Sequence, residues 1–207
     1  MLNINICAQD AYLALYPQSK KPVGVNWPDE GTSQEQALAT NGNLGLLLGP
    51  KSDVMDVDLD CREAKGLAEL ILPKPFAQFD RGTSDSGHYL YKAITCGPTK
   101  KFSGNGPKST LVELRGDGSQ TMIPPSIHPD GSRLNFTDIN HDAPEVEYAD
   151  LLKSVSFLAA CSEVAQIWVS GRRHELALSF SGLCLKQDVD PQLLVNINAH
   201  FPSNRMI

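Results

Sequence analysis

The chain has 207 residues, of which 41% are hydrophobic, and a formal net charge of −6 at pH 7. This length and composition allow one sizeable hydrophobic core and a small second unit. The negative charge argues against a protein that coats DNA non-specifically, because such proteins neutralise phosphates with a basic surface. It does not exclude an enzyme that acts on nucleic acid, since acidic metal ligands contribute to the same balance.

The cysteines and the N-terminus indicate a reducing compartment. The five cysteines are odd in number, scattered and never paired as CxxC, so we expect free thiols and no zinc site. Residues 1–5 lack the basic and then apolar layout of a signal peptide. No apolar run approaches the roughly 20 residues that span a bilayer. We therefore expect a cytoplasmic protein with no membrane partner.

The spacing of apolar residues predicts a mixed organisation for residues 1–149. It predicts helices over residues 10–17, 33–40 and 62–72. It predicts strands over residues 44–48, 54–60, 76–79, 88–91, 110–115 and 120–123. The expected fold class is therefore α+β, with a mixed α/β catalytic domain over residues 1–149.

Helical spacing takes over from about residue 150. It predicts helices over residues 150–159 and 172–186, and a third that begins at Asp190-Pro191, where proline suits a first turn. We expect residues 150–207 to form a small helical extension. Because the chain stops a few residues after its last predicted helix, we expect it to be part of a longer protein.

Three aspartates alternate with apolar residues along the predicted strand 54–60. Successive side chains of a strand point to opposite faces, so Asp56, Asp58 and Asp60 share one face. Neighbouring acids repel one another unless a cation lies between them. Oxygen ligands favour a divalent ion such as Mg²⁺ or Mn²⁺. The alternative is an exposed strand with a solvated acidic face.

A Gly- and Ser-rich loop over residues 81–87 leads into His88. An imidazole beside loop hydroxyls such as Ser86 could hold a triphosphate, and Arg81 adds a cation at the start of the loop. The alternative is a histidine that caps the end of a strand.

The predicted strand 110–115 carries Glu113 and Arg115 on the same face. A glutamate and an arginine two positions apart fit a metal ligand beside a phosphate-binding group. They fit equally well as a surface ion pair.

Residues 124–131, Pro-Pro-Ser-Ile-His-Pro-Asp-Gly, follow the predicted strand 120–123 directly. The two prolines stiffen the chain, and Asp130-Gly131 favours a tight hairpin turn. One interpretation is a functional segment, and the other is a rigid support for a neighbouring site.

Two basic positions could contact the phosphates of nucleic acid. One is Lys100-Lys101, in a polar segment that we expect to be a loop over residues 97–108. The other is Arg172-Arg173 at the start of a predicted helix, for which a packing helix with a solvated basic end is the alternative.

Four of these segments, in this order, resemble the bifunctional DNA primase/polymerase N-terminal family, the Prim-Pol branch of the archaeo-eukaryotic primase superfamily. The resemblance extends from about residue 21 to residue 136 and rests on the motifs within 49–60, 79–91, 112–121 and 124–131. Residues 171–178 also resemble the helical segment that follows this domain in phage and plasmid replication proteins, often ahead of a helicase domain.

The resemblance implies a Prim-Pol fold with an RRM-like catalytic sheet and two catalytic metal ions, Mg²⁺ or Mn²⁺. Two of the three aspartates would bind these ions, and the spacing from Ser52 favours Asp58 and Asp60, with Asp56 as the third candidate. Glu113 would supply the remaining metal carboxylate.

The resemblance also implies a nucleotide site. His88 would contact the phosphates of the incoming nucleotide, with Ser86 beside it, and Arg115 would be a further nucleotide contact. Arg81 is the additional cation of this predicted site.

The implied activity is a template-dependent nucleotidyltransferase, which makes primers on single-stranded DNA and extends them from dNTPs or NTPs. A metal-dependent nuclease is one alternative, although such a site would call for a lysine where Arg115 lies. A non-catalytic module that binds single-stranded DNA or nucleotides for a helicase is the other.

Overall fold

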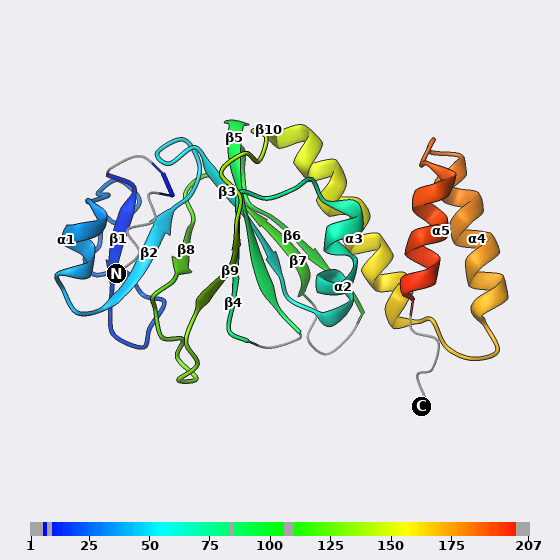
Figure 1. Ribbon diagram of the computed structural model, residues 1–207, viewed down its shortest axis with the longest axis horizontal. Helices are drawn as coiled ribbons and strands as arrows, with labels where there is room; N and C mark the ends of the chain where they lie inside the picture. The colour runs from blue at the N-terminus through cyan, green and yellow to red at the C-terminus, as the bar shows by residue number, and fades with distance from the viewer. Residues whose placement is uncertain (1–5, 8–9, 83–84, 106–109, 202–207) are drawn as a thin grey trace.

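The computed structural model describes residues 6–7, 10–82, 85–105 and 110–201 (Figure 1). The strands are β1 (Tyr12–Leu15), β2 (Asn43–Leu47), β3 (Val54–Leu59), β4 (Ala77–Asp80), β5 (Gly87–Thr95), β6 (Lys100–Ser103), β7 (Thr110–Arg115), β8 (Gln120–Ile123), β9 (Asn135–Ile139) and β10 (Val146–Glu147). The helices are α1 (Gln34–Leu38), α2 (Arg62–Ile71), α3 (Tyr148–Gln166), α4 (Arg173–Leu185) and α5 (Pro191–His200).

The strands form two sheets. The larger sheet has the order β6-β7-β3-β5-β4-β9 with antiparallel neighbours, and β10 runs parallel to the end of β5. The smaller sheet has the antiparallel order β1-β2-β8. The central position of β3 explains why all six of its residues are buried, the aspartates included.

One face of the larger sheet is covered by helices. The apolar residues of β3 (Met55, Val57 and Leu59) belong to the same hydrophobic core as buried residues of α2 and α3. Helix α2 buries Ala64, Leu67 and Ala68, the spacing of a stripe along one helix face. The opposite face of β3, which carries the acids, is thereby directed away from the helices.

The smaller sheet lies on the other side of the larger one (Figure 1). A second hydrophobic core joins Phe79 and Leu90 of the larger sheet to Leu44, Leu46 and Ile123 of the smaller sheet. The protein is therefore layered, with the larger sheet between the helices α2 and α3 and the smaller sheet.

The C-terminal helices continue the first core. Val155 and Leu158 of α3, Phe180 of α4 and Ile197 of α5 belong to the same cluster as the apolar face of β3. Figure 1 shows α4 and α5 beyond α3, on the side away from the smaller sheet. The predicted domain boundary at residue 150 stays a prediction. A chain that ended there would lose α3, which covers the apolar face of the larger sheet.

The structure confirms the α+β fold class and corrects several local predictions. Residues 10–17 were predicted as a helix, but they contain strand β1, because Tyr12, Leu13 and Leu15 are buried in pairing with β2. An edge strand buried on both faces shows no period-2 alternation. The predicted loop 97–108 likewise contains β6. Among the described helices, none is long and apolar enough to cross a membrane.

Candidate active site

The register of the larger sheet gathers most of the predicted site residues on one face. Asp58 of β3 lies directly opposite Glu113 of β7 on one side and His88 of β5 on the other. Asp56 lies opposite Arg115 of β7. Directly opposite residues of antiparallel strands project to the same face. The five side chains therefore form a compact polar patch on the face that is turned toward the smaller sheet.

Asp56 and His88 form a buried ion pair. Asp56 is 0% exposed, and its carboxylate oxygens lie 3.0 and 3.2 Å from His88 Nδ1. Burial raises the pKa of Asp56, but His88 and Arg115 outweigh it and lower the pKa below its usual value. Burial lowers the pKa of His88, but Asp56 and Asp58 outweigh it and raise that pKa. Both shifts favour the charged forms of the pair.

The His88 ring is held on three sides. Phe79 stacks on it, with ring centroids 4.6 Å apart and planes 7° from parallel. Asp56 engages Nδ1, and Nε2 lies 3.6 Å from an oxygen of Asp58. Because Asp56 is buried and paired with this ring, Asp58 and Asp60 are the aspartates of the triplet that line the pocket described below.

Arg115 links two of the predicted metal ligands. Its Nη2 donates to Asp58 at 2.5 Å, and its Nε donates to Glu113 at 2.9 Å. Burial by itself would lower the pKa of Arg115. The negative charges of Asp58, Asp56 and Glu113 have the larger effect and raise that pKa above its usual value. The ion pair that the sequence allowed is present, and any cation that binds these carboxylates competes with the guanidinium.

Asp60 follows the end of β3 and is exposed. Partial desolvation, together with the negative charges of Asp58 and Glu113, raises the pKa of Asp60 to about 6, although Arg115 opposes the shift. The carboxylates here outnumber the cations that could neutralise them. A divalent ion would relieve this repulsion.

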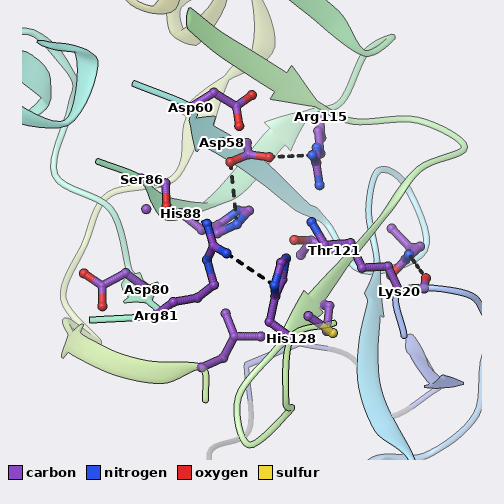
Figure 2. A pocket seen from close by; sticks show the side chains of 14 residues that line it. Lys20, Asp58, Asp60, Asp80, Arg81, Ser86, His88, Arg115, Thr121 and His128 are labelled. Atoms are coloured by element: carbon purple, nitrogen blue, oxygen red, sulfur yellow. Dashed lines mark hydrogen bonds and ion pairs between the residues drawn. The ribbon is translucent and has the colours of Figure 1, made fainter. Parts of the chain in front are cut away.

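A pocket lies between the polar face of the larger sheet and the smaller sheet (Figure 2). Asp58, Asp60 and Arg115 line one part of it. The remaining lining residues come from the ends of β4 and β5, from β8 and from nearby loops: Lys20, Asp80, Arg81, Ser86, Gly87, His88, Gln120, Thr121, Met122, His128 and Leu134. The pocket therefore has an acidic side on β3 and a basic side that draws on both sheets.

The basic side is centred on Arg81, which follows β4 directly. Its Nη2 donates to Ser86 Oγ at 3.3 Å. Its Nη1 lies 3.3 Å from His128 Nδ1 and donates to Asp130 at 2.6 Å. The adjacent Asp80 pairs with Lys65 at 2.7 Å. The predicted residues Arg81, Ser86 and His88 thus lie in one pocket with Asp58 and Asp60, whereas Glu113 is not among its lining residues.

The remaining predicted contacts lie elsewhere. Lys100 and Lys101 are exposed on the edge strand β6, and Lys101 lies opposite Glu113, on the polar face but outside the pocket. Arg172 and Arg173 stand at the start of α4, which α3 separates from the sheets (Figure 1). These four residues are not part of the pocket that the structure describes.

Sequence reasoning assigned no site role to Lys20, Thr121 or His128, although all three line the pocket. His128 lies in the 124–131 motif, and that motif was the only available signal for it. Lys20 lies in the loop that follows β1 of the smaller sheet. No sequence pattern shows that such a loop lies near β3.

The predicted metal ligands are not arranged around a ready ion site. Within the part of the chain that the structure describes, no three His, Cys, Asp or Glu side chains stand as a ready metal site. Two of the three predicted ligands are turned to Arg115 instead. Their chemistry still fits Mg²⁺ or Mn²⁺, because Asp58, Asp60 and Glu113 offer carboxylate oxygens at neighbouring positions and carry excess negative charge.

Comparison with known proteins shows the family of the chain. A search of curated proteins finds no match to the chain. The family model for the bifunctional DNA primase/polymerase N-terminal domain (Prim-Pol) matches residues 8–149, which include both sheets and every residue of the pocket. The chain therefore belongs to the Prim-Pol family of bifunctional DNA primase/polymerase domains.

Proposed function

We propose that the chain is a template-dependent nucleotidyltransferase that makes primers on single-stranded DNA and extends them from dNTPs or NTPs. Membership of a DNA primase/polymerase family supports this proposal. The observation that carries it is the division of one pocket into an acidic side, with Asp58 and Asp60, and a basic side, with Arg81, Ser86 and His88. Transfer of a nucleotidyl group calls for both sides, because phosphates and their counter-ions bind together.

We propose that Asp58, Asp60 and Glu113 hold Mg²⁺ or Mn²⁺, with buried Asp56 as a support rather than a ligand. Bound divalent ions would stabilise negative charge on the phosphates and activate the attacking 3′-hydroxyl group. The carboxylates of the chain fix where this positive charge lies. Asp56 holds the His88 ring, and Arg115 neutralises the acids until a cation competes for them.

The basic side would bind and orient the triphosphate. Arg81 can present a guanidinium group to two phosphate oxygens, and the Ser86 hydroxyl can donate beside it. The raised pKa of His88 keeps its ring protonated beside Asp56 and Asp58, so the ring offsets part of their negative charge where the triphosphate would lie. Orientation and charge stabilisation together supply the catalysis in this proposal.

The template would lie outside the pocket. Base pairing with single-stranded DNA would select the nucleotide, so the chain needs no base-reading motif. We propose Lys100, Lys101, Arg172 and Arg173 as contacts to DNA phosphates, because all four lie outside the pocket. A cytoplasmic setting and a helicase partner or domain complete the proposal.

Primer extension tests this function directly. The protein would be incubated with single-stranded DNA, with and without an annealed primer, labelled nucleotides, and Mg²⁺ or Mn²⁺. Extension that is lost in Asp58→Ala and in Asp60→Ala but retained in Asp138→Ala, an exposed aspartate on β9, is the expected result. Shortened DNA without extension would instead identify a nuclease, and nucleotide binding without either product would identify a binding module.

A further inference from the structure

The 124–131 motif is fastened to the smaller sheet. Ser126 Oγ accepts from the Leu44 backbone N–H at 2.8 Å and donates to the Leu44 carbonyl at 3.2 Å. The Asn43 side chain donates to the Ile127 carbonyl at 2.7 Å and accepts from the Ile127 N–H at 2.9 Å. Both partners belong to β2, so the motif has a fixed position relative to that sheet.

The two carboxylate oxygens of Asp130 have separate partners. Oδ1 accepts from the backbone N–H of Ser132 at 2.9 Å and from its hydroxyl at 2.5 Å, which closes the turn. Oδ2 accepts from Arg81 Nη1 at 2.6 Å and lies 3.0 Å from His128 Nδ1. One oxygen therefore maintains the local turn, and the other reaches the opposite sheet.

Arg81 spans the space between the two sheets. It extends from the end of β4 in the larger sheet, and its Nη1 meets His128 and Asp130 of the motif that is fastened to the smaller sheet. Its Nη2 is directed to Ser86 (Figure 2). Arg81 and His128 line the pocket, whereas Asp130 does not. Anchoring Nη1 fixes the plane of the guanidinium group and leaves its other edge beside Ser86.

We propose that Asp130, together with His128, positions Arg81 to receive the phosphates of the incoming nucleotide. The proposal rests on the proposed nucleotidyltransferase function and gives the 124–131 motif a specific role in it. Asp130 acts through Arg81 and does not touch the nucleotide. A long arginine side chain loses much rotamer freedom when it binds, and a partner that holds it beforehand reduces that loss.

Asp130→Asn separates the two tasks of this side chain. An asparagine can still accept from Ser132 through its single oxygen, but it then turns an amide group, which cannot accept, toward Arg81 and His128. Ser132→Ala is the matched control, because it weakens the turn and leaves both Asp130 oxygens in place.

The experiment measures KM and kcat for the nucleotide in primer extension, together with the Kd for template DNA and the thermal midpoint of each variant. Arg81→Gln should raise KM by about 10- to 150-fold, the loss of a charge-assisted hydrogen bond. Asp130→Asn should raise KM by about two- to fivefold with kcat nearly unchanged, as expected for a half-exposed ion pair. The double variant should resemble Arg81→Gln alone, and Ser132→Ala should resemble the wild type.

Four results would overturn the assignment while the wild type remains active. The first is a KM in the double variant that rises by the product of the two single effects. The second is tighter nucleotide binding by Asp130→Asn, and the third is an unchanged KM in Arg81→Gln. The fourth is weakened template binding in place of weakened nucleotide binding. Tighter binding would mean that Asp130 competes with the phosphates. A wild type that neither binds nor incorporates nucleotides would instead overturn the proposed function, and this inference with it.

Discussion

The acidic and basic sides of the pocket are built in different ways. The acidic side lies within one sheet, where backbone register alone brings Asp58, Glu113 and Arg115 together. The basic side lies between two sheets, where Arg81 must reach across to a motif fastened to β2. Backbone pairing defines positions closely, whereas a long side chain across a gap depends on each of its contacts. We therefore expect the arrangement of the acidic side to survive the loss of single side chains, whereas the orientation of Arg81 on the basic side should be lost when one of its contacts is removed.

The largest effect is expected from Asp58, at the centre of the acidic side. Asp58→Asn should reduce nucleotide incorporation by more than the roughly 10- to 100-fold typical of indirect metal-site changes, because it removes a proposed ligand. The fold should persist, since asparagine retains the volume. Incorporation assays with matched circular dichroism spectra measure both effects. Incorporation within about threefold of the wild type would exclude Asp58 as a metal ligand. Asp56 would then be the candidate ligand in its place.

Arg115→Gln tests whether the guanidinium is the resident counter-ion of the acids. Without metal, the variant should lose about 1–3 kcal/mol of stability, because it leaves two partly buried carboxylates without their cation. With Mn²⁺ it should recover more stability than the wild type, since the ion no longer competes with arginine. Thermal unfolding over a Mn²⁺ titration measures this, with exposed Arg133→Gln as the control.

A result in which Mn²⁺ stabilises Arg115→Gln less than the wild type would contradict that competition. It would indicate instead that Arg115 orients the carboxylates for the ion.

The Asp56–His88 pair predicts a pH dependence of stability in the absence of metal. The pKa of His88 is raised above 6.5 by Asp56 and Asp58 against burial and Arg115, so its stabilising effect is complete below pH 6.5. The effect is lost as pH rises through the raised pKa. The pKa of Asp56 is lowered below its usual value of 3.8. The stabilising effect of the pair is therefore also lost as the pH falls below 3.8 and through the lowered pKa of Asp56.

His88→Gln should therefore cost about 1.5–3 kcal/mol near pH 6 and progressively less in alkaline buffer. Chemical unfolding of both proteins between pH 5 and pH 9, in the presence of a chelator, measures the difference. His141→Gln, an exposed histidine, serves as the control. A difference that grows as the pH rises over this range would contradict a raised pKa of His88.

The smallest effect is expected outside the pocket. Replacing both Lys100 and Lys101 by Gln should weaken template binding by about two- to tenfold, because the side chains are exposed. The slope of the logarithm of the template Kd against the logarithm of the salt concentration should fall by no more than about 2. The KM for the nucleotide should not change. A larger rise in that KM than in the template Kd would place β6 in the nucleotide site.

The contrast between the two sides also explains how far the sequence could predict the site. Alternation along residues 54–60 identified the acidic face, because a strand with period 2 has one possible arrangement. It could not show that Asp56 is buried against His88, since that depends on the pairing of β3 with β5.

The basic side was predicted in part. Arg81, Ser86 and His88 are close in sequence, so one loop revealed all three. His128 and Lys20 meet them only through the contact of two sheets, which no local pattern encodes. The helix that was predicted over residues 10–17 failed for the same reason, because pairing with β2 decided the conformation.

Nucleotide binding as a function of Mn²⁺ concentration tests the division of the pocket most directly. The Kd of a labelled triphosphate would be measured for the wild type, Asp58→Asn and Arg81→Gln without turnover. The wild type should bind more tightly as Mn²⁺ increases. Asp58→Asn should lose that dependence, and Arg81→Gln should keep it while binding more weakly at every concentration. Identical behaviour of the two variants, or a wild type that is insensitive to Mn²⁺, would contradict the proposed separation of metal and phosphate sites.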